Sequence, residues 1–191
     1  MSAFVFKNRG ALLALPAVLL VIFGKPSALG IMVGLPIAVA GELLRCWAVG
    51  YSGVTTRNDA VIAPELVTAG PYAYVRNPLY IGNFITAVGF AIAFTGGNPA
   101  ATRTALLVVA LGTMIAVYAT IIPHEEHFLQ ARFGESFIRY CREVARIIPR
   151  GKSAANPQGT WKPEVIAQAE SRTFLFFGAM LILLAVKAFL V

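Results

Sequence analysis

Charged residues are scarce in this sequence, and acidic residues are fewer than basic ones. Only 13% of the 191 residues are charged, against roughly 25% in a soluble domain, whereas 58% are hydrophobic. The mean hydropathy is +0.72. A soluble domain of this length has too little interior to bury so much apolar surface, and a disordered chain needs low hydrophobicity and high charge. The composition excludes both classes and predicts an integral membrane protein.

Cysteine is also rare. Cys46 and Cys141 stand far apart and match neither a disulfide framework nor the closely spaced pairs of a zinc site. The sequence contains no internal repeat, no low-complexity tract and no glycine motif of the Walker or dinucleotide-binding type. The informative residues of such a chain are polar side chains near the ends of its apolar segments.

Five apolar segments have roughly the length needed to cross a bilayer, which takes about 20 residues per helix. Short turns at Gly24–Ser27 and Thr95–Pro99 join them into two hairpins. Two longer polar loops, Ala48–Pro78 and Pro123–Arg172, follow the second and fourth segments. The sequence thus predicts an all-α fold, a single membrane domain over residues 1–191 built as a polytopic bundle of five transmembrane helices. The expected segments are Phe4–Phe23, Ala28–Trp47, Leu79–Phe94, Thr104–Ile122 and Thr173–Val191.

The positive charges predict the orientation of the bundle. With the N-terminus in the cytoplasm, 13 Lys and Arg residues lie inside, and Lys25, Arg103 and Lys187 lie outside, as the positive-inside rule favours. In a membrane protein the formal charge of +7 favours contact with anionic headgroups over nucleic acid. Both long loops are then cytoplasmic, including a flexible polar linker to the last helix at 151–163. The alternative for residues 1–23, a cleavable signal peptide, lacks a clear small-residue cleavage site.

The first of three polar groups is Gly70–Gly82 (GPYAYVRNPLYIG). Asn77-Pro78 ends a turn and begins the third helix, because proline disfavours a helical conformation before it and fits the first helical turn. Free amide groups at that helix start could hold a carboxylate, and Gly82 would let a flat group approach the backbone. The alternative is a juxtamembrane connector whose tyrosines form an interfacial aromatic belt.

The second group is Pro123–Leu129 (PHEEHFL), directly after the fourth segment. The adjacent carboxylates Glu125 and Glu126 are costly at a membrane border without a cationic partner, which a bound ammonium group would supply. His124 and His127 do not form a His-Glu-x-x-His motif and have no third ligand cluster, so we expect no metal site. The alternative is a solvated, salt-bridged helix start.

The third group is Phe133–Pro149, in which Phe137, Tyr140 and Val144 recur at helical spacing with charged residues between them. This pattern predicts a short cytoplasmic juxtamembrane helix that lies along the membrane surface. Its basic residues would contact anionic lipid, a role that a catalytic one does not exclude.

In this order the three groups resemble the isoprenylcysteine carboxyl methyltransferase and phospholipid N-methyltransferase family. The resemblance covers residues 70–149, the expected methyltransferase motif region. It implies an integral membrane enzyme that binds S-adenosylmethionine on the cytoplasmic side and takes a lipid-like acceptor from the bilayer. We expect a prokaryotic inner-membrane location. The matching positions are Gly70, Tyr72, Arg76, Pro78, Tyr80, Gly82, Glu125, Glu126, Phe133, Gly134, Phe137, Tyr140, Val144, Arg146 and Pro149.

The resemblance also implies roles for single residues. Glu125 or Glu126 would bind the α-amino group of the cofactor, and the Arg76–Gly82 turn would line its adenosyl and carboxylate end. Asn77 replaces the usual family histidine and cannot take up a proton, so we expect it to grip the cofactor rather than relay a proton. The expected cofactor-binding residues are Arg76, Asn77, Pro78, Tyr80, Gly82, Glu125 and Glu126, and the expected catalytic residues are Arg146, Tyr140 and Asn77, of which Tyr140 and Arg146 would close the pocket.

The expected reaction is methyl transfer from S-adenosylmethionine to a lipophilic carboxylate, thiol or amine. A carboxylate is ionised at neutral pH and needs no base, whereas a thiol or an ammonium group must first lose a proton. Asn77 therefore slightly favours a carboxylate or a readily ionised thiol, although His124, His127 and Glu126 could serve as bases for an amine.

Two alternative functions stay open. The first is an NADPH-dependent membrane reductase of related architecture, whose 2′-phosphate the arginines between 139 and 146 could hold. The second is a non-catalytic scaffold or transporter. A transporter would carry polar residues near mid-span, and here only Glu42 and Arg45, which we interpret as an ion pair, come close.

Overall fold

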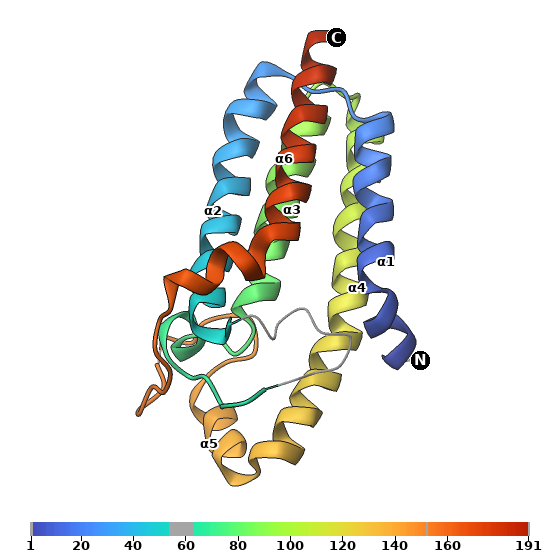
Figure 1. Ribbon diagram of the computed structural model, residues 1–191. Helices are drawn as coiled ribbons and strands as arrows, with labels where there is room; N and C mark the ends of the chain where they lie inside the picture. The colour runs from blue at the N-terminus through green and yellow to red at the C-terminus, as the bar shows by residue number, and fades with distance from the viewer. Residues whose placement is uncertain (1, 54–62, 152, 191) are drawn as a thin grey trace.

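Within the described residues, five long helices run lengthwise through the structure (Figure 1). The computed structural model describes residues 2–53, 63–151 and 153–190, so Arg57 and Lys152, two of the predicted cytoplasmic cations, lie outside the described residues. No strand occurs in the described ranges, and one isolated parallel bridge joins Val75 and Ala145. The elements are α1 (Ser2–Phe23), α2 (Ala28–Ser52), η2 (Gly70–Ala73), α3 (Pro78–Thr95), α4 (Ala100–Phe133), α5 (Glu135–Glu143), η3 (Pro163–Val165) and α6 (Ile166–Leu190).

Four helical stretches of the described chain are long and apolar enough to cross a membrane: α2, α3, α4 and the segment Pro163–Leu190 that contains α6. The apolar part of α1, Asn8–Phe23, is shorter. The predicted short turns are present, and they join α1 to α2 and α3 to α4. The all-helical membrane bundle expected from the sequence is therefore confirmed at the level of four candidate spans.

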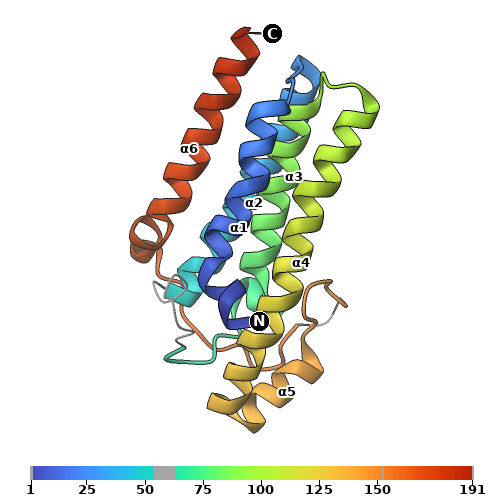
Figure 2. The same ribbon diagram turned by 90° about the vertical axis from the view of Figure 1, so that its right-hand side faces the viewer.

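The polar elements gather at one end of the bundle. Figures 1 and 2 show η2 and α5 at the end where α1 begins, whereas α6 ends at the opposite end. At that opposite end Lys187 Nζ donates hydrogen bonds to the carbonyls of Val21 and Ile22 (2.6 and 3.0 Å). Arg103 donates to the carbonyls of Gly96 and Asn98, both at 3.1 Å. Two cations at this end thus serve to satisfy carbonyls at helix ends.

Small residues hold α2 and α3 in close contact. A Cβ added at Gly41 would lie 2.5 Å from Thr86 N and 2.6 Å from the Gly82 carbonyl. One added at Gly82 would lie 2.6 Å from Arg45 Cγ, and Thr86 donates a hydrogen bond to the Ala38 carbonyl at 3.3 Å. Such small-residue contacts let backbones approach closely where lipid supplies no hydrophobic drive for helix association.

Helix α4 continues through Pro123 to Phe133, so the expectation that it ends at Ile122 is wrong. The end of the apolar run marks where the chain leaves the apolar core, whereas the residues that follow it are mostly good helix formers. Leu129 and Phe133, on the polar extension, also pack against the cluster that contains α5. Glu125 and Glu126 consequently lie within a continuous helix.

The apolar side of helix α5 is buried within the protein, whereas the sequence predicted only that the helix lies along the membrane surface. Phe137 and Tyr140 are 3% and 6% exposed. They form a cluster with Val144, Ala73 and Ala154. The protein itself therefore covers the apolar face of α5. Through this face α5 packs against the end of α4 and against the loop segments that precede α3 and follow α5.

Candidate active site

Glu126 is the centre of a cluster drawn from three parts of the chain. Arg76 contacts Glu126 Oε1 through Nε (3.0 Å) and Nη2 (2.9 Å). Arg146 contacts Oε2 through Nε (2.9 Å) and Nη2 (2.6 Å). Asn77 Nδ2 donates to Glu126 Oε1 at 3.3 Å and to the Arg146 carbonyl at 3.2 Å. The carboxylate is buried at 8% exposure, and its charge is matched by cations of the chain itself.

Glu125, the neighbouring carboxylate, has different contacts. Its Oε1 accepts a hydrogen bond from the Tyr80 hydroxyl at 2.7 Å, and the positive charge of Arg9 on α1 acts on it. Successive residues of a helix point about 100° apart, which separates the two carboxylates into two environments. Arg9 is one of the 13 predicted cytoplasmic cations, and its proximity to Glu125 was not predicted because nothing in the sequence links α1 to the motif.

Backbone contacts join the start of α3 to the segment after α5. Arg76 N donates to the Ala145 carbonyl at 2.8 Å, next to the bridge between Val75 and Ala145. Arg76 Nη1 also donates to the Val144 carbonyl. Because of these bonds, two motifs about 70 residues apart meet at one carboxylate.

Tyr140 fixes the other side of this junction. Its hydroxyl donates to the Tyr72 carbonyl at 2.6 Å. Burial raises the pKa of the Tyr140 and Tyr72 phenols, so both stay protonated at neutral pH. Burial also raises the pKa of the Cys141 thiol, which disfavours a nucleophilic thiolate there.

Two predicted cofactor residues lie in packed surroundings. Pro78 is the fully buried first residue of α3. The space beside Gly82 is filled by Arg45 and Gly41 of α2, so the close approach allowed by this glycine is made by a helix. The prediction that a flat group approaches the backbone at Gly82 is therefore wrong.

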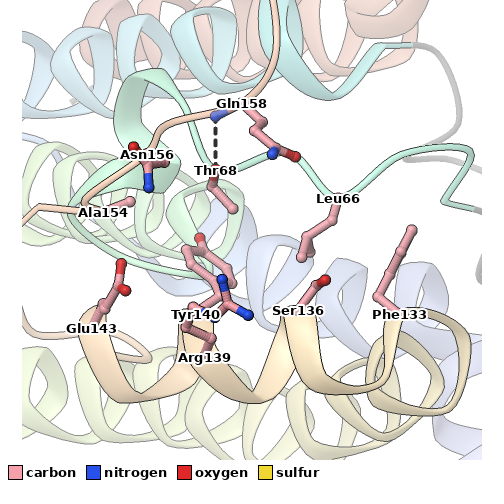
Figure 3. A pocket seen from close by; sticks show the side chains of 10 residues that line it. All are labelled: Leu66, Thr68, Phe133, Ser136, Arg139, Tyr140, Glu143, Ala154, Asn156 and Gln158. Atoms are coloured by element: carbon pink, nitrogen blue, oxygen red, sulfur yellow. Dashed lines mark hydrogen bonds between the residues drawn. The ribbon is translucent and has the colours of Figure 1, made fainter.

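A cavity of about 330 Å³ opens between α5 and the segments 66–68 and 154–158 (Figure 3), and the residues that hold Glu126 do not line it. Tyr140 is the member of the predicted site that lines it, together with Arg139 and Glu143. Its far wall is fixed by Gln158 N, which donates to Thr68 Oγ1 at 2.8 Å. The chain segment after α5 thus forms part of the wall of this cavity.

A second polar cluster lies deeper in the bundle. Arg45 forms the expected ion pair with Glu42 (Nε–Oε2, 3.8 Å), but Glu170 on α6 binds it more closely, at 2.7 Å. Glu170 stands three residues before the apolar segment predicted for the last helix, and the prediction treated that region as loop. The sequence signal for such a partner was the position of Arg45 inside an apolar segment, where a cation needs an acidic partner. Across the described residues, no group of three or more His, Cys, Asp or Glu side chains is placed to hold a metal ion.

The sequence matches known proteins over much of this region. Residues 29–136 match the sequence model of the phospholipid methyltransferase family. The nickel-cobalt-cadmium resistance protein NccN of Alcaligenes xylosoxydans xylosoxydans is 35% identical over 119 residues, which are 62% of this chain and 48% of that protein. Protein-S-isoprenylcysteine O-methyltransferase B of Arabidopsis thaliana is 32% identical over 120 residues, or 61% of this chain and 57% of the relative.

Protein-S-isoprenylcysteine O-methyltransferase of Schizosaccharomyces pombe is 38% identical over 84 residues, covering 44% of this chain and 33% of the yeast protein. The chain spans about half the length of the first curated relatives it matches. No solved structure matches at a significant level. The family match covers more than half of the chain and includes Arg76, Asn77, Tyr80, Glu125 and Glu126. This chain is an integral membrane protein that belongs to the phospholipid methyltransferase family.

Proposed function

We propose that the protein transfers a methyl group from S-adenosylmethionine to a lipophilic acceptor at the cytoplasmic face of a membrane. The observation that carries this proposal is the convergence of Arg76, Asn77 and Arg146 on Glu126, beside the Tyr80–Glu125 pair. These residues come from separate motifs, and all lie where the polar elements of the bundle gather. Family membership supplies the reaction class.

The donor set fits the amino-acid end of S-adenosylmethionine, which carries an ammonium group and a carboxylate. Glu126 is already matched by two arginines and Asn77, whereas Glu125 accepts a hydrogen bond from the neutral Tyr80 hydroxyl. We therefore assign the ammonium group to Glu125. Arg146, whose side chain is 51% exposed, is the accessible cation for the carboxylate, and Glu126 keeps it in place.

When bound, the cofactor supplies a methyl group already activated by a sulfonium centre. The residues of this chain then have to hold and orient the reactants and exclude water. Asn77 orients Glu126 and the backbone at Arg146. Tyr140 closes the junction between η2 and α5 through its bond to the Tyr72 carbonyl.

The acceptor we propose is a carboxylate on a lipid-like molecule. Two of the relatives are named O-methyltransferases of protein-S-isoprenylcysteine, and a carboxylate oxygen is ionised at neutral pH without help from a base. Asn77 cannot act as a base that takes up a proton from a thiol or an ammonium group. The residues present thus suit an acceptor that needs no deprotonation.

The proposed topology has five spans with the N-terminus in the cytoplasm. Helix α1 contains 22 residues, within the working range of roughly 17–25 for a membrane span. It lies alongside α4, so it shares the environment of a candidate span. An odd number of spans places the start of α1 and the end of α6 at opposite ends, as Figure 1 shows.

The direct test is binding of S-adenosylmethionine to the purified protein in lipid nanodiscs, measured by calorimetry, with NADPH titrated in parallel. We expect saturable binding of S-adenosylmethionine and none of NADPH. Membranes incubated with cofactor labelled in its methyl group should then yield a labelled lipid whose label is released by mild alkali, as from a carboxyl methyl ester. Binding of NADPH alone would refute the proposal in favour of a reductase.

A further inference from the structure

A buried ion pair ties α6 to α2. Arg45 Nη2 donates to both oxygens of Glu170, at 2.7 and 2.8 Å, and to Thr173 Oγ1 at 3.3 Å. Glu170 is 0% exposed and Arg45 is 8% exposed. Removing one partner of such a pair leaves a charge buried without compensation, which is strongly unfavourable. The pair therefore fixes the position of α6 where α6 meets α2.

The same arginine connects this pair to α3 and α4. Arg45 Nη1 donates to Asn83 Oδ1, one helical turn after Tyr80 on α3. The Tyr118 hydroxyl on α4 lies beside Asn83, and the Tyr118 ring packs against the Tyr80 ring with centroids 4.7 Å apart. Contacts therefore run from Glu170 through Arg45 to Asn83, which lies one turn from Tyr80 on α3.

Tyr80 is the residue that holds Glu125, through its 2.7 Å hydrogen bond. Its ring is confined on one side by Tyr118, and the helix that carries it is held to α2 at Asn83. A shift of Arg45 would move Asn83 and release this confinement. The orientation of the Glu125 carboxylate thus depends on a charge pair that does not touch it.

We infer that Arg45 and Glu170 are positioning residues for the active site, and that α6 acts through them to orient Tyr80 and Glu125. This inference rests on the proposed function. It gives the last helix, which lies outside the family match to residues 29–136, a role beyond membrane anchoring. Much of α6 faces outward, with Leu175 and Ile182 at 74% and 66% exposure. Its buried ion pair with α2 therefore contrasts with the mostly exposed apolar surface of the helix.

The test measures the affinity for S-adenosylmethionine alone, in nanodiscs, for the unmodified protein and for Glu170→Gln. Because Arg45 keeps Glu42 as a charge partner, Glu170→Gln should fold. We expect its affinity to fall about 2- to 30-fold, the range for residues that act through a chain of contacts. The matched control is Lys187→Gln, which loosens the opposite end of α6 and should leave the affinity within twofold of the unmodified protein.

A double variant separates positioning from general loss of stability. Tyr80→Phe alone should weaken binding, and Glu170→Gln added to it should weaken binding little further, because both changes release Glu125. Should Glu170→Gln fail to fold, Arg45→Lys, which keeps the charge but loses the forked contact, takes its place in the same cycle. Fully additive effects, or normal affinity in Glu170→Gln, would overturn the inference while the proposed function stands. Absence of binding by the unmodified protein would overturn both.

Discussion

Glu125 and Glu126 are adjacent in sequence but have distinct partners. Glu126 is held by Arg76, Asn77 and Arg146, and Glu125 accepts a hydrogen bond from Tyr80. Both carboxylates lie on the continuation of α4 beyond Pro123, so the helical rotation between adjacent residues turns them towards different elements. Glu125 is therefore the carboxylate proposed to bind a ligand, and Glu126 is the one that holds the residues of the site together.

The two glutamates should respond differently to the same substitution. Glu125→Gln removes the proposed partner of the ammonium group and should weaken S-adenosylmethionine binding by about 2–5 kcal/mol, with little effect on thermal stability. Glu126→Gln should lower the unfolding midpoint as well, because it releases two arginines. Calorimetry and thermal unfolding of both variants check this. Equal binding losses with equal stability losses would contradict the division of roles.

Asn77 is expected to organise the cofactor site without titrating. Asn77→Ala should weaken cofactor binding by at most about 1.5–3 kcal/mol, the value of the lost hydrogen bond to the charged Glu126, because Glu126 and Arg146 are then less well oriented. Asn77→His should restore binding but make it depend on pH near the ordinary imidazole pKa of about 6.5. Titrations between pH 5.5 and 8 check both. Normal cofactor affinity in Asn77→Ala together with lost turnover would instead place Asn77 at the acceptor.

At the residue scale, the sequence predicted which polar side chains share one site better than it predicted how they pair within it. The motif order identified Arg76, Asn77, Glu126 and Arg146, and the structure brings them together. The sequence argument left open whether Glu125 or Glu126 binds the ammonium group of the cofactor. It could not show that Arg146 pairs with Glu126, because that contact depends on how the segment after α5 returns to α3.

At the element scale, the contact between α2 and α3 depends on missing side chains. Gly41→Leu should prevent the close approach, because its Cβ alone would lie 2.5 Å from Thr86 N. We expect a loss of stability of at least about 1–3 kcal/mol, as for overpacking. The control is Gly112→Leu on α4, where nothing lies within 4 Å of the added Cβ. Unfolding in mild detergent measures both, and similar midpoints would contradict the role of the α2–α3 contact.

Hydropathy predicted the existence of the long helices but not their ends. Hydropathy measures where the chain is apolar, whereas a helix ends where its backbone hydrogen bonds end. Helix α4 continues past Ile122 because its polar extension packs on the α5 cluster, and α6 begins at Ile166, before its apolar run, where Glu170 meets Arg45. For the same reason the amphipathic pattern of α5 identified a buried face but not what buries it.

For the whole molecule, the proposed topology places residue 153 in the cytoplasm and residue 102 outside. Ser153 and Thr102 are both exposed, so single cysteines there, in a background without Cys46 and Cys141, can be labelled in intact cells. We expect an impermeant maleimide added outside to label Thr102→Cys. Ser153→Cys should react only after the membrane is permeabilised. The opposite pattern would invert the molecule and with it the side on which the cofactor binds.

The length of α4 sets the depth of the chemistry. Glu125 and Glu126 lie three and four residues beyond Ile122, a rise of roughly 5 Å along the helix, so the proposed topology would place the site level with the headgroups rather than with bulk water. In that topology the position of the two carboxylates along α4 would decide which part of a membrane-bound acceptor reaches them. The site would select an acceptor by how far its reactive atom stands above the hydrocarbon, so that lipids with different tails but equally placed carboxylates would be equivalent substrates.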